Sequence, residues 1–285
     1  MKAMILSACF IAIVGLAACA QDNSRSWSDE PDSRFYLHLG VGGGIGLCDY
    51  DPCDEFDEDY GPTSDVLSSV NFAPGKGFNV DLGFGYRFNR YFSAELDIND
   101  HFGLKTKTNV TYESIYDSYT KNTSYRAMVF SLIPSFVITP GLENYNPYAR
   151  FGLGIGIIPD IYYTEVKTSG STETSIEGRY HGGIPLGYSI AAGMDFNLTK
   201  GFKLFGEFDF TGMNYTPKYY DLTKYTVNGT DILGGLSESQ KRTEFVKSYD
   251  KKENIPSTSP SKQLKQTFPV SGFGLSVGAS YNFGK

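Results

Sequence analysis

Nine charged residues fall in stretches of the sequence where apolar residues occupy every second position. They are Asp81, Arg87, Glu95, Asp97, Arg150, Asp195, Lys203, Glu207 and Asp209. If these stretches are strands, the alternation places all nine charges on the face opposite to the apolar one. Charges gathered on one enclosed face must be paired to be tolerated, so the sequence predicts a network of ion pairs there.

A second group of reactive side chains lies in an acidic segment, residues 47–75, which we call loop 1. Four residues separate Cys48 from Cys53, a spacing that permits a disulfide in an exported protein. The segment also contains oxygen ligands that could hold Ca²⁺, namely Asp49, Asp51, Asp54 and Glu55. Their spacing lacks the EF-hand pattern and its glycine, so a solvated acidic loop is favoured and neither a metal nor another cofactor is expected.

The three histidines, His38, His101 and His181, give little support for catalysis. We expect His38 on the charged face and the other two near the rim formed by the long connections. No serine at a recognisable spacing accompanies them, and His101 beside Asp97 or Asp100 is too common a pairing to identify a base. No glycine-rich phosphate-binding motif occurs, so we expect that the protein is not an enzyme.

The elements that must position these residues are eight stretches of alternating sequence. They span about 34–46, 78–88, 91–99, 125–138, 147–158, 184–198, 202–212 and 270–283. In the last stretch, Phe273, Leu275 and Val277 oppose small residues. The chain of 285 residues contains 21 Tyr, 21 Phe and 32 Gly with only 20% charged residues, a composition that suits many strands. After residue 20 no apolar run is long enough for a transmembrane helix.

Long connections alternate with tight turns along these strands, so the long connections share one end and both termini lie at the other. The last long connection, residues 213–267, is mildly basic, and we call it loop 4. Its 237–254 portion is expected to form a short helix or to be disordered. Such asymmetry is expected of outer-membrane barrels, which have short periplasmic turns and long external loops.

The alternation alone does not say which face is inside, because a soluble ligand-carrying barrel would have its apolar face inward. Glycine on the polar face favours the crowded interior of a small barrel. Aromatic residues near strand ends also predict two membrane girdles. The girdle at the turns would contain Phe88, Tyr91, Phe92, Tyr148, Phe196, Phe202, Tyr281 and Phe283, and the girdle toward the loops Tyr125, Tyr215 and Phe268.

The N-terminal residues 1–20 have the charge and apolar run of a signal peptide. We expect cleavage after Ala20, followed by a periplasmic segment, 21–33, and the barrel domain, 34–285. The alternative is a lipobox in which Cys19 becomes the lipidated N-terminus.

Residues 276–283 resemble the C-terminal signature by which bacterial outer-membrane barrels are recognised for insertion, with Gly278, Tyr281 and Phe283 as its matching positions. Residues 147–154, 193–199 and 204–208 are similar to the small outer-membrane β-barrel superfamily, which includes the OmpA transmembrane domain, opacity proteins and OmpW-like proteins. The resemblance implies an all-β, eight-stranded antiparallel transmembrane barrel in the bacterial outer membrane, in contact with lipid and the barrel-assembly machinery. Gly284 and Lys285 depart from the signature, and no peptidoglycan-binding domain is expected.

We expect such a barrel to display loops 1 and 4 outside the cell for adhesion, host interaction or envelope integrity. The alternatives are a narrow porin-like channel for small solutes and, less favoured, a lipid-modifying enzyme. Eight strands leave an interior that side chains just fill, so the charge network is favoured as a structural plug over a pore. The partners expected are lipid and an extracellular or host ligand. The net charge is −7 and the sequence has no basic patch or arm, so we expect no nucleic-acid partner, and we expect a monomer.

Overall fold

The computed structural model describes residues 34–47, 59–60, 65–66, 73–113, 118–142, 144–199, 201–250 and 256–283. The expected signal peptide, the segment 21–33 and the last two residues lie outside the described residues. So do several side chains singled out above: Cys19, Cys48, Asp49, Asp51, Cys53, Asp54 and Glu55. No helix in the described part of the chain is long and apolar enough to cross a membrane.

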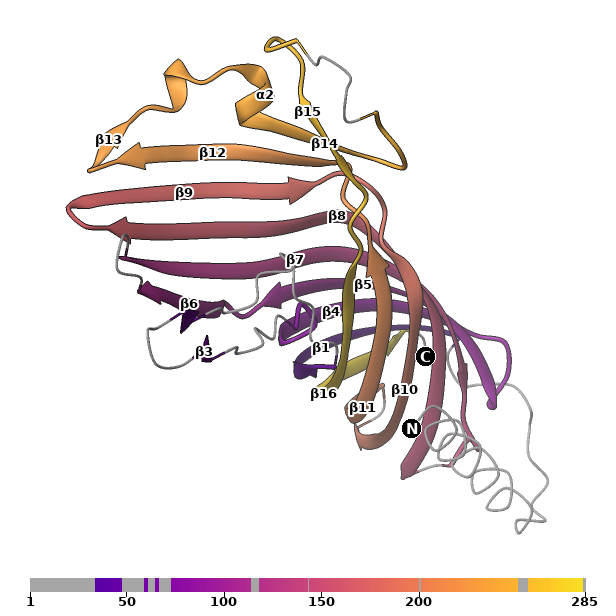
Figure 1. Ribbon diagram of the computed structural model, residues 1–285. Helices are drawn as coiled ribbons and strands as arrows, with labels where there is room; N and C mark the ends of the chain where they lie inside the picture. The colour runs from indigo at the N-terminus through magenta and orange to yellow at the C-terminus, as the bar shows by residue number, and fades with distance from the viewer. Residues whose placement is uncertain are drawn as a thin grey trace.

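Among the described residues, eight antiparallel strands form a closed barrel (Figure 1). They are β1 (Phe35–Gly46), β4 (Gly77–Arg87), β5 (Phe92–Gly103), β7 (Ser118–Ile138), β8 (Tyr145–Ser169), β10 (Leu186–Thr199), β11 (Phe202–Tyr215) and β16 (Phe268–Phe283). Pairing of β16 with β1 and of β7 with β8 completes the ring. The predicted all-β, eight-stranded antiparallel barrel is confirmed, and only β7 and β8 extend far beyond their predicted bounds.

The seam between the first and last strands runs without interruption from the pair Phe35 and Phe283 to the pair Gly46 and Gly272. Glycine is required on the inner side of this seam because aromatic rings pack against the backbone. A Cβ atom on Gly278 would lie 2.5 Å from the Phe205 ring. The glycines of the polar face therefore make room for large side chains that fill the interior.

The outer surface of the barrel wall is apolar. Val277, Leu275 and Leu153 have exposed fractions of 61%, 67% and 64%. Side chains of this kind on every strand form the apolar band of a membrane-spanning barrel. At the turns, seven predicted girdle residues are exposed on this surface: Phe88, Tyr91, Phe92, Phe196, Phe202, Tyr281 and Phe283.

The other predicted girdle positions are wrong. Tyr148 lines the interior, where its hydroxyl donates a hydrogen bond to Glu207 at 2.8 Å. Tyr125, Tyr215 and Phe268 are almost completely buried. They form a luminal apolar cluster with Ala127, Val129, Ile161, Met213 and Val270. These side chains point inward because of the alternation along each strand. Phe268, for example, is an even number of residues from the inward-facing glycines of β16, so it lies on the same face as they do.

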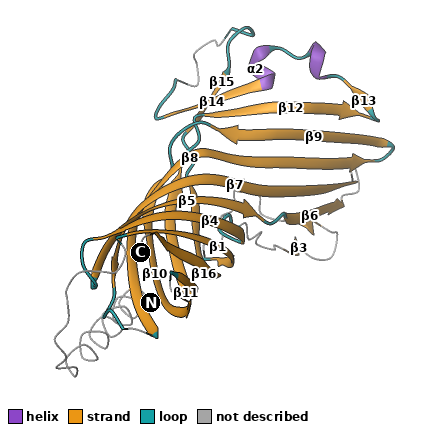
Figure 2. Ribbon diagram, turned by 180° about the vertical axis from the view of Figure 1, so that it is seen from behind, coloured by secondary structure: helices purple, strands orange, loops and turns teal. Residues whose placement is uncertain are grey.

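Beyond the barrel, β7 and β8 remain paired as far as Tyr119 and Ser169. Four further strands continue the sheet from β8 in the order β9 (Thr172–His181), β12 (Tyr219–Val227), β14 (Arg242–Val246) and β15 (Ser261–Leu264), while β6 (Thr106–Glu113) pairs with β7 on the other side. We call this seven-stranded structure the extension sheet, and Figure 2 shows it from behind. A small strand, β13 (Thr230–Asp231), pairs with the end of β12.

The long connections are therefore more ordered than expected. In loop 4, the described residues form strands, a 3-10 turn, η1 (Leu233–Gly235), and a single helical turn, α2 (Glu238–Lys241). The Gln240 side chain accepts a hydrogen bond from the Ser237 backbone N–H at 2.9 Å and starts that turn. The predicted helix is thus much shorter than 237–254, and disorder is wrong for the described part. In loop 1, β2 (Asp59–Tyr60) pairs with β3 (Asp65–Val66).

Candidate functional site

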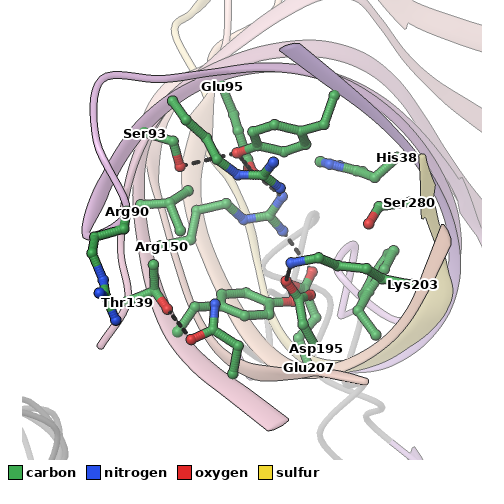
Figure 3. A pocket seen from close by; sticks show the side chains of 16 residues that line it. His38, Arg90, Ser93, Glu95, Thr139, Arg150, Asp195, Lys203, Glu207 and Ser280 are labelled. Carbon is green, nitrogen blue, oxygen red and sulfur yellow. Dashed lines mark hydrogen bonds and ion pairs between the residues drawn. The ribbon is translucent and has the colours of Figure 1, made fainter. Parts of the chain in front are cut away.

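The most densely charged part of the molecule is the barrel interior, where Arg150 contacts three carboxylates. Its guanidinium lies 2.5 Å from Glu207, 3.1 Å from Asp97 and 3.6 Å from Glu95. Figure 3 shows Arg150, Glu95 and Glu207 projecting from the wall into the interior. Arg150 is on β8, whereas Asp97 and Glu95 are on β5 and Glu207 is on β11. Because neither β5 nor β11 is adjacent to β8 in the barrel, these ion pairs cross the lumen and brace the wall.

Polar side chains of β1 and β8 complete this network. The His38 Nε2 atom lies 3.0 Å from an Asp97 oxygen. The Tyr36 hydroxyl donates to Glu95 at 2.5 Å, and that of Tyr148 donates to Glu207. The sequence predicted that His38 faces the lumen but missed both tyrosines as network members. The sequence did contain a signal for Tyr36: it lies two residues from His38 on β1, so the two side chains point to the same face of the strand.

The remaining predicted charges lie in the same interior but make different contacts. Lys203 pairs with Asp195 at 3.1 Å, and the Arg87 guanidinium lies 4.3 Å from the centre of the Tyr36 ring. In the part of the chain that the structure describes, Asp81 and Asp209 form no ion pair. Instead they accept hydrogen bonds: Asp81 from Asn79 and Asn99, and Asp209 from Ser276. The interior thus contains an ion-paired zone and a zone held by amides and hydroxyls.

Three small cavities lie within the described part of the lumen. One of about 70 Å³ is on the turn side of the Arg150 network, and one of about 60 Å³ is on the loop side, beside Asp209 and His101. The smallest, of about 20 Å³, lies between them, beside Arg150 and Asp81. Each of the two larger cavities has room for at least two water molecules. Beyond the loop-side cavity, the luminal apolar cluster fills the barrel. Side chains therefore occupy most of the lumen, as the narrow diameter of eight strands requires.

Donor atoms of His38, Glu95 and Asp97 lie within 4.8 Å of one another, a grouping that could hold a metal ion. However, Arg150 already contacts both carboxylates. A divalent cation placed between them would meet the guanidinium charge, so the arrangement fits an ion-pair network better than a metal centre.

The other two histidines lie in different surroundings. His101, which was predicted to lie near the rim, lines the loop-side cavity inside the barrel, with its Nε2 atom 3.1 Å from the Pro74 carbonyl oxygen. His181 is on the extension sheet, 2.8 Å from Asp221. Arg242 also binds Asp221 through two hydrogen bonds of 2.7 and 2.9 Å. This cluster joins β9, β12 and β14, outside the membrane-spanning strands.

The Asp221 cluster should make the attachment of β14 sensitive to acid. The hydrogen bonds from Arg242, and next those from His181, hold the pKa of Asp221 below its usual range. A lowered folded pKa contributes stability above the unfolded value of about 3.9, and this stability is lost as the pH falls through the lower folded value. Asp221→Asn should remove this dependence and weaken the β12–β14 contact by up to about 1 kcal/mol. Amide exchange of β14 between pH 7 and pH 3 measures both effects; equal protection in the two proteins at every pH would contradict the prediction.

Comparison with known proteins places this geometry in a family. The model of the family "Outer membrane protein beta-barrel domain" matches residues 8–237. A Rickettsia canadensis (strain McKiel) protein named as a candidate adhesin is 24% identical over 163 residues, which is 57% of this chain and 65% of that protein. The match therefore spans less than two thirds of that relative.

Several solved structures also match the chain, among them Ail and AlkL. Ail, the attachment invasion locus protein of Yersinia pestis, is 10% identical, with a TM-score of 0.27 over 89% of this chain and 99% of Ail. The outer membrane protein AlkL is 10% identical, with a TM-score of 0.37 over 93% of this chain and 97% of AlkL. These TM-scores are too low to support a conclusion about function. The family model, in contrast, covers more than half of the sequence, so the chain belongs to the outer membrane protein beta-barrel domain family and is a β-barrel of the bacterial outer membrane.

Proposed function

We propose that this outer-membrane barrel holds the extension sheet outside the cell as a binding surface for an extracellular or host ligand. The extension sheet is the observation that carries the proposal. It is built from the long connections of the barrel, and the tight turns all lie at the opposite end. Outer-membrane barrels place their long connections outside the cell, which favours the same orientation here.

The extension sheet has an ordered, paired backbone, which suits a binding surface. Backbone pairing continues from the barrel wall through β8, β9 and β12, so the sheet is a continuation of the wall rather than a separate lobe. Near the barrel, Tyr180 packs against Phe245 and Phe268, with ring centres 6.0 and 5.4 Å apart. A surface that is ordered before binding loses little conformational entropy when a ligand arrives.

The side chains of the extension sheet also suit recognition. Tyr219 and Tyr225 are partly exposed on β12. Tyrosine offers a large contact area and a hydroxyl group, and it is enriched in protein interfaces. The candidate-adhesin name of the Rickettsia canadensis relative supports an adhesive role for this surface.

A closed lumen favours display over conduction. The Arg150 network crosses the barrel, and the luminal apolar cluster fills its loop end. We propose accordingly that the protein is neither an open channel nor an enzyme, and that it acts as a monomer.

The test is adhesion of bacteria that carry the protein. In a non-adherent host, the full chain should increase attachment to animal-cell monolayers or to immobilised extracellular-matrix proteins. A truncated variant in which a two-residue turn joins Thr164 to Glu177 would remove the tip of the β8–β9 hairpin at a paired position. We expect this variant to lose most of the attachment. A matched variant with two glycines inserted after Gly170, at the tip itself, should keep it.

Three measurements make the result decisive. Heat-modifiable migration on gels shows that each variant folds, and protease treatment of intact cells shows whether the extension is outside. Equal attachment by the truncated variant at equal surface levels would contradict the proposal. In planar bilayers the full chain should give no unitary current steps, and reproducible steps would instead favour the channel.

A further inference from the structure

A pocket of about 400 Å³ lies on the outer wall where β7 and β8 leave the barrel. It is lined by Lys105, Ser124, Arg126, Met128, Tyr162 and Thr164. These residues come from three separate segments, the β5–β6 connection, β7 and β8, which are held together by backbone pairing. The pocket shares no residue with the Arg150 network, and membership of the family does not explain its presence.

The pocket lies at the level where the outer wall changes from apolar to polar. On β7, the outward residues are Phe136, Leu132, Phe130 and Met128 up to this level, and Arg126 and Ser124 above it. On β8, Leu153, Ile155 and Ile158 are followed by Asp160, Tyr162 and Thr164. On the β5 side, Leu104 is 41% exposed and is followed by Lys105. The pocket is therefore beside the headgroups of the membrane.

Two cations in this pocket are not neutralised by the protein. Arg126 donates from Nε to the Gly103 carbonyl oxygen at 3.2 Å, which fixes the side chain without compensating its charge. Across the described residues, neither Lys105 nor Arg126 forms an ion pair. Asp160, on the neighbouring position of β8, lies 3.7 Å from Arg179. The pocket thus has a net positive charge at a depth where anionic headgroups are found.

We propose that this pocket binds the phosphorylated headgroup of an outer-leaflet glycolipid. Arginine and lysine are the side chains that bind phosphate oxygens most strongly, and arginine can do so with two parallel hydrogen bonds. The hydroxyl groups of Ser124, Thr164 and Tyr162 can donate to phosphate or sugar oxygens, and Met128 meets the start of the acyl chains. The assignment to the outer leaflet rests on the proposed orientation of the extension sheet.

The test uses the purified full chain in a neutral detergent, titrated with bis-phosphorylated lipid A and followed by native mass spectrometry. The variant combines Lys105→Gln with Arg126→Gln, and both side chains are outside the folded core. A matched control combines Lys224→Gln with Lys265→Gln, which changes the net charge equally at exposed positions elsewhere on the extension side. Since each basic residue contributes about fivefold to the attraction of an anionic lipid surface, we expect the double variant to bind at least tenfold more weakly.

The control variant should bind bis-phosphorylated lipid A with an affinity within twofold of that of the unmodified protein. The unmodified protein should bind fully dephosphorylated lipid A as weakly as the double variant binds the phosphorylated form. Equal affinity of the unmodified protein and the double variant would overturn the proposal. Equal affinity for phosphatidylglycerol or for inorganic phosphate would overturn the assignment to a glycolipid. The readout does not depend on adhesion, so a failed attachment assay and a failed lipid titration are separate results.

Discussion

Arg150→Met should lower the free energy of unfolding of the barrel by about 3–5 kcal/mol, because it leaves buried carboxylates without their cation. In the folded protein, Glu207, Asp97 and Glu95 all lie within 4 Å of this guanidinium. Methionine keeps much of the side-chain volume, so the loss would come from charge rather than from a cavity. Urea titration in lipid vesicles, followed by the gel mobility of the folded and unfolded forms, measures the change.

Two further variants separate a network effect from a local one. Adding Glu207→Gln to Arg150→Met should restore part of the stability, since one of the uncompensated charges is removed. Lys203→Gln should cost less than Arg150→Met, because within the described ranges Lys203 pairs with one carboxylate, that of Asp195. Unfolding of Arg150→Met at the same urea concentration as the unmodified protein would show that the luminal ion pairs contribute no stability.

Val277→Arg should destabilise the inserted barrel by about 2–4 kcal/mol, the cost of a basic side chain on the lipid face near the bilayer midplane. Val277 is 61% exposed on the outer wall and lies midway between Phe273 and Tyr281 along the outward face of β16. Neighbouring pairs with Val41 and Gly206 offer the guanidinium no acidic partner. The same urea titration gives the change in free energy.

Val277→Leu is the matched control, since it keeps an apolar side chain toward lipid and should alter stability by less than about 1 kcal/mol. If Val277→Arg inserts and unfolds like this control, the exposed apolar face of β16 does not face lipid. Such a result would reverse the assignment of the lipid-facing and luminal faces of the strands, while the order of the strands in the barrel would stay the same.

The barrel could be predicted from the sequence because lipid and lumen impose opposite demands on alternate residues. In β16, Leu275 and Val277 face outward, whereas Gly274, Ser276 and Gly278 face the interior. The same parity brings the charged residues to the luminal face. It does not say which charges meet, because that depends on their heights on strands that are not neighbours. The central position of Arg150 therefore had to come from the structure.

The extension sheet could not be predicted from alternation. Most side chains of β9 and β12 are half-buried or exposed and few enter a core, so polar and apolar residues do not alternate regularly. The burial of Tyr215 and Phe268 was predictable in principle, because both have luminal parity. The general preference of aromatic residues for membrane interfaces was the wrong principle to apply there.

The long pairing of β7 with β8, interrupted by a bulge between Phe130 and Ser131 and again at Pro134, has a mechanical consequence. A ligand that pulls on the tip of the extension would load these two strands along their length. Their backbone hydrogen bonds, from the pair Tyr119 and Ser169 down to the pair Ile138 and Ala149, run across the direction of pull and would share the load in shear. Such a ladder resists force collectively, whereas a hairpin pulled open at its end loses one bond at a time. The barrel, held by the bilayer, would then serve as the anchor for a stiff lever at the cell surface.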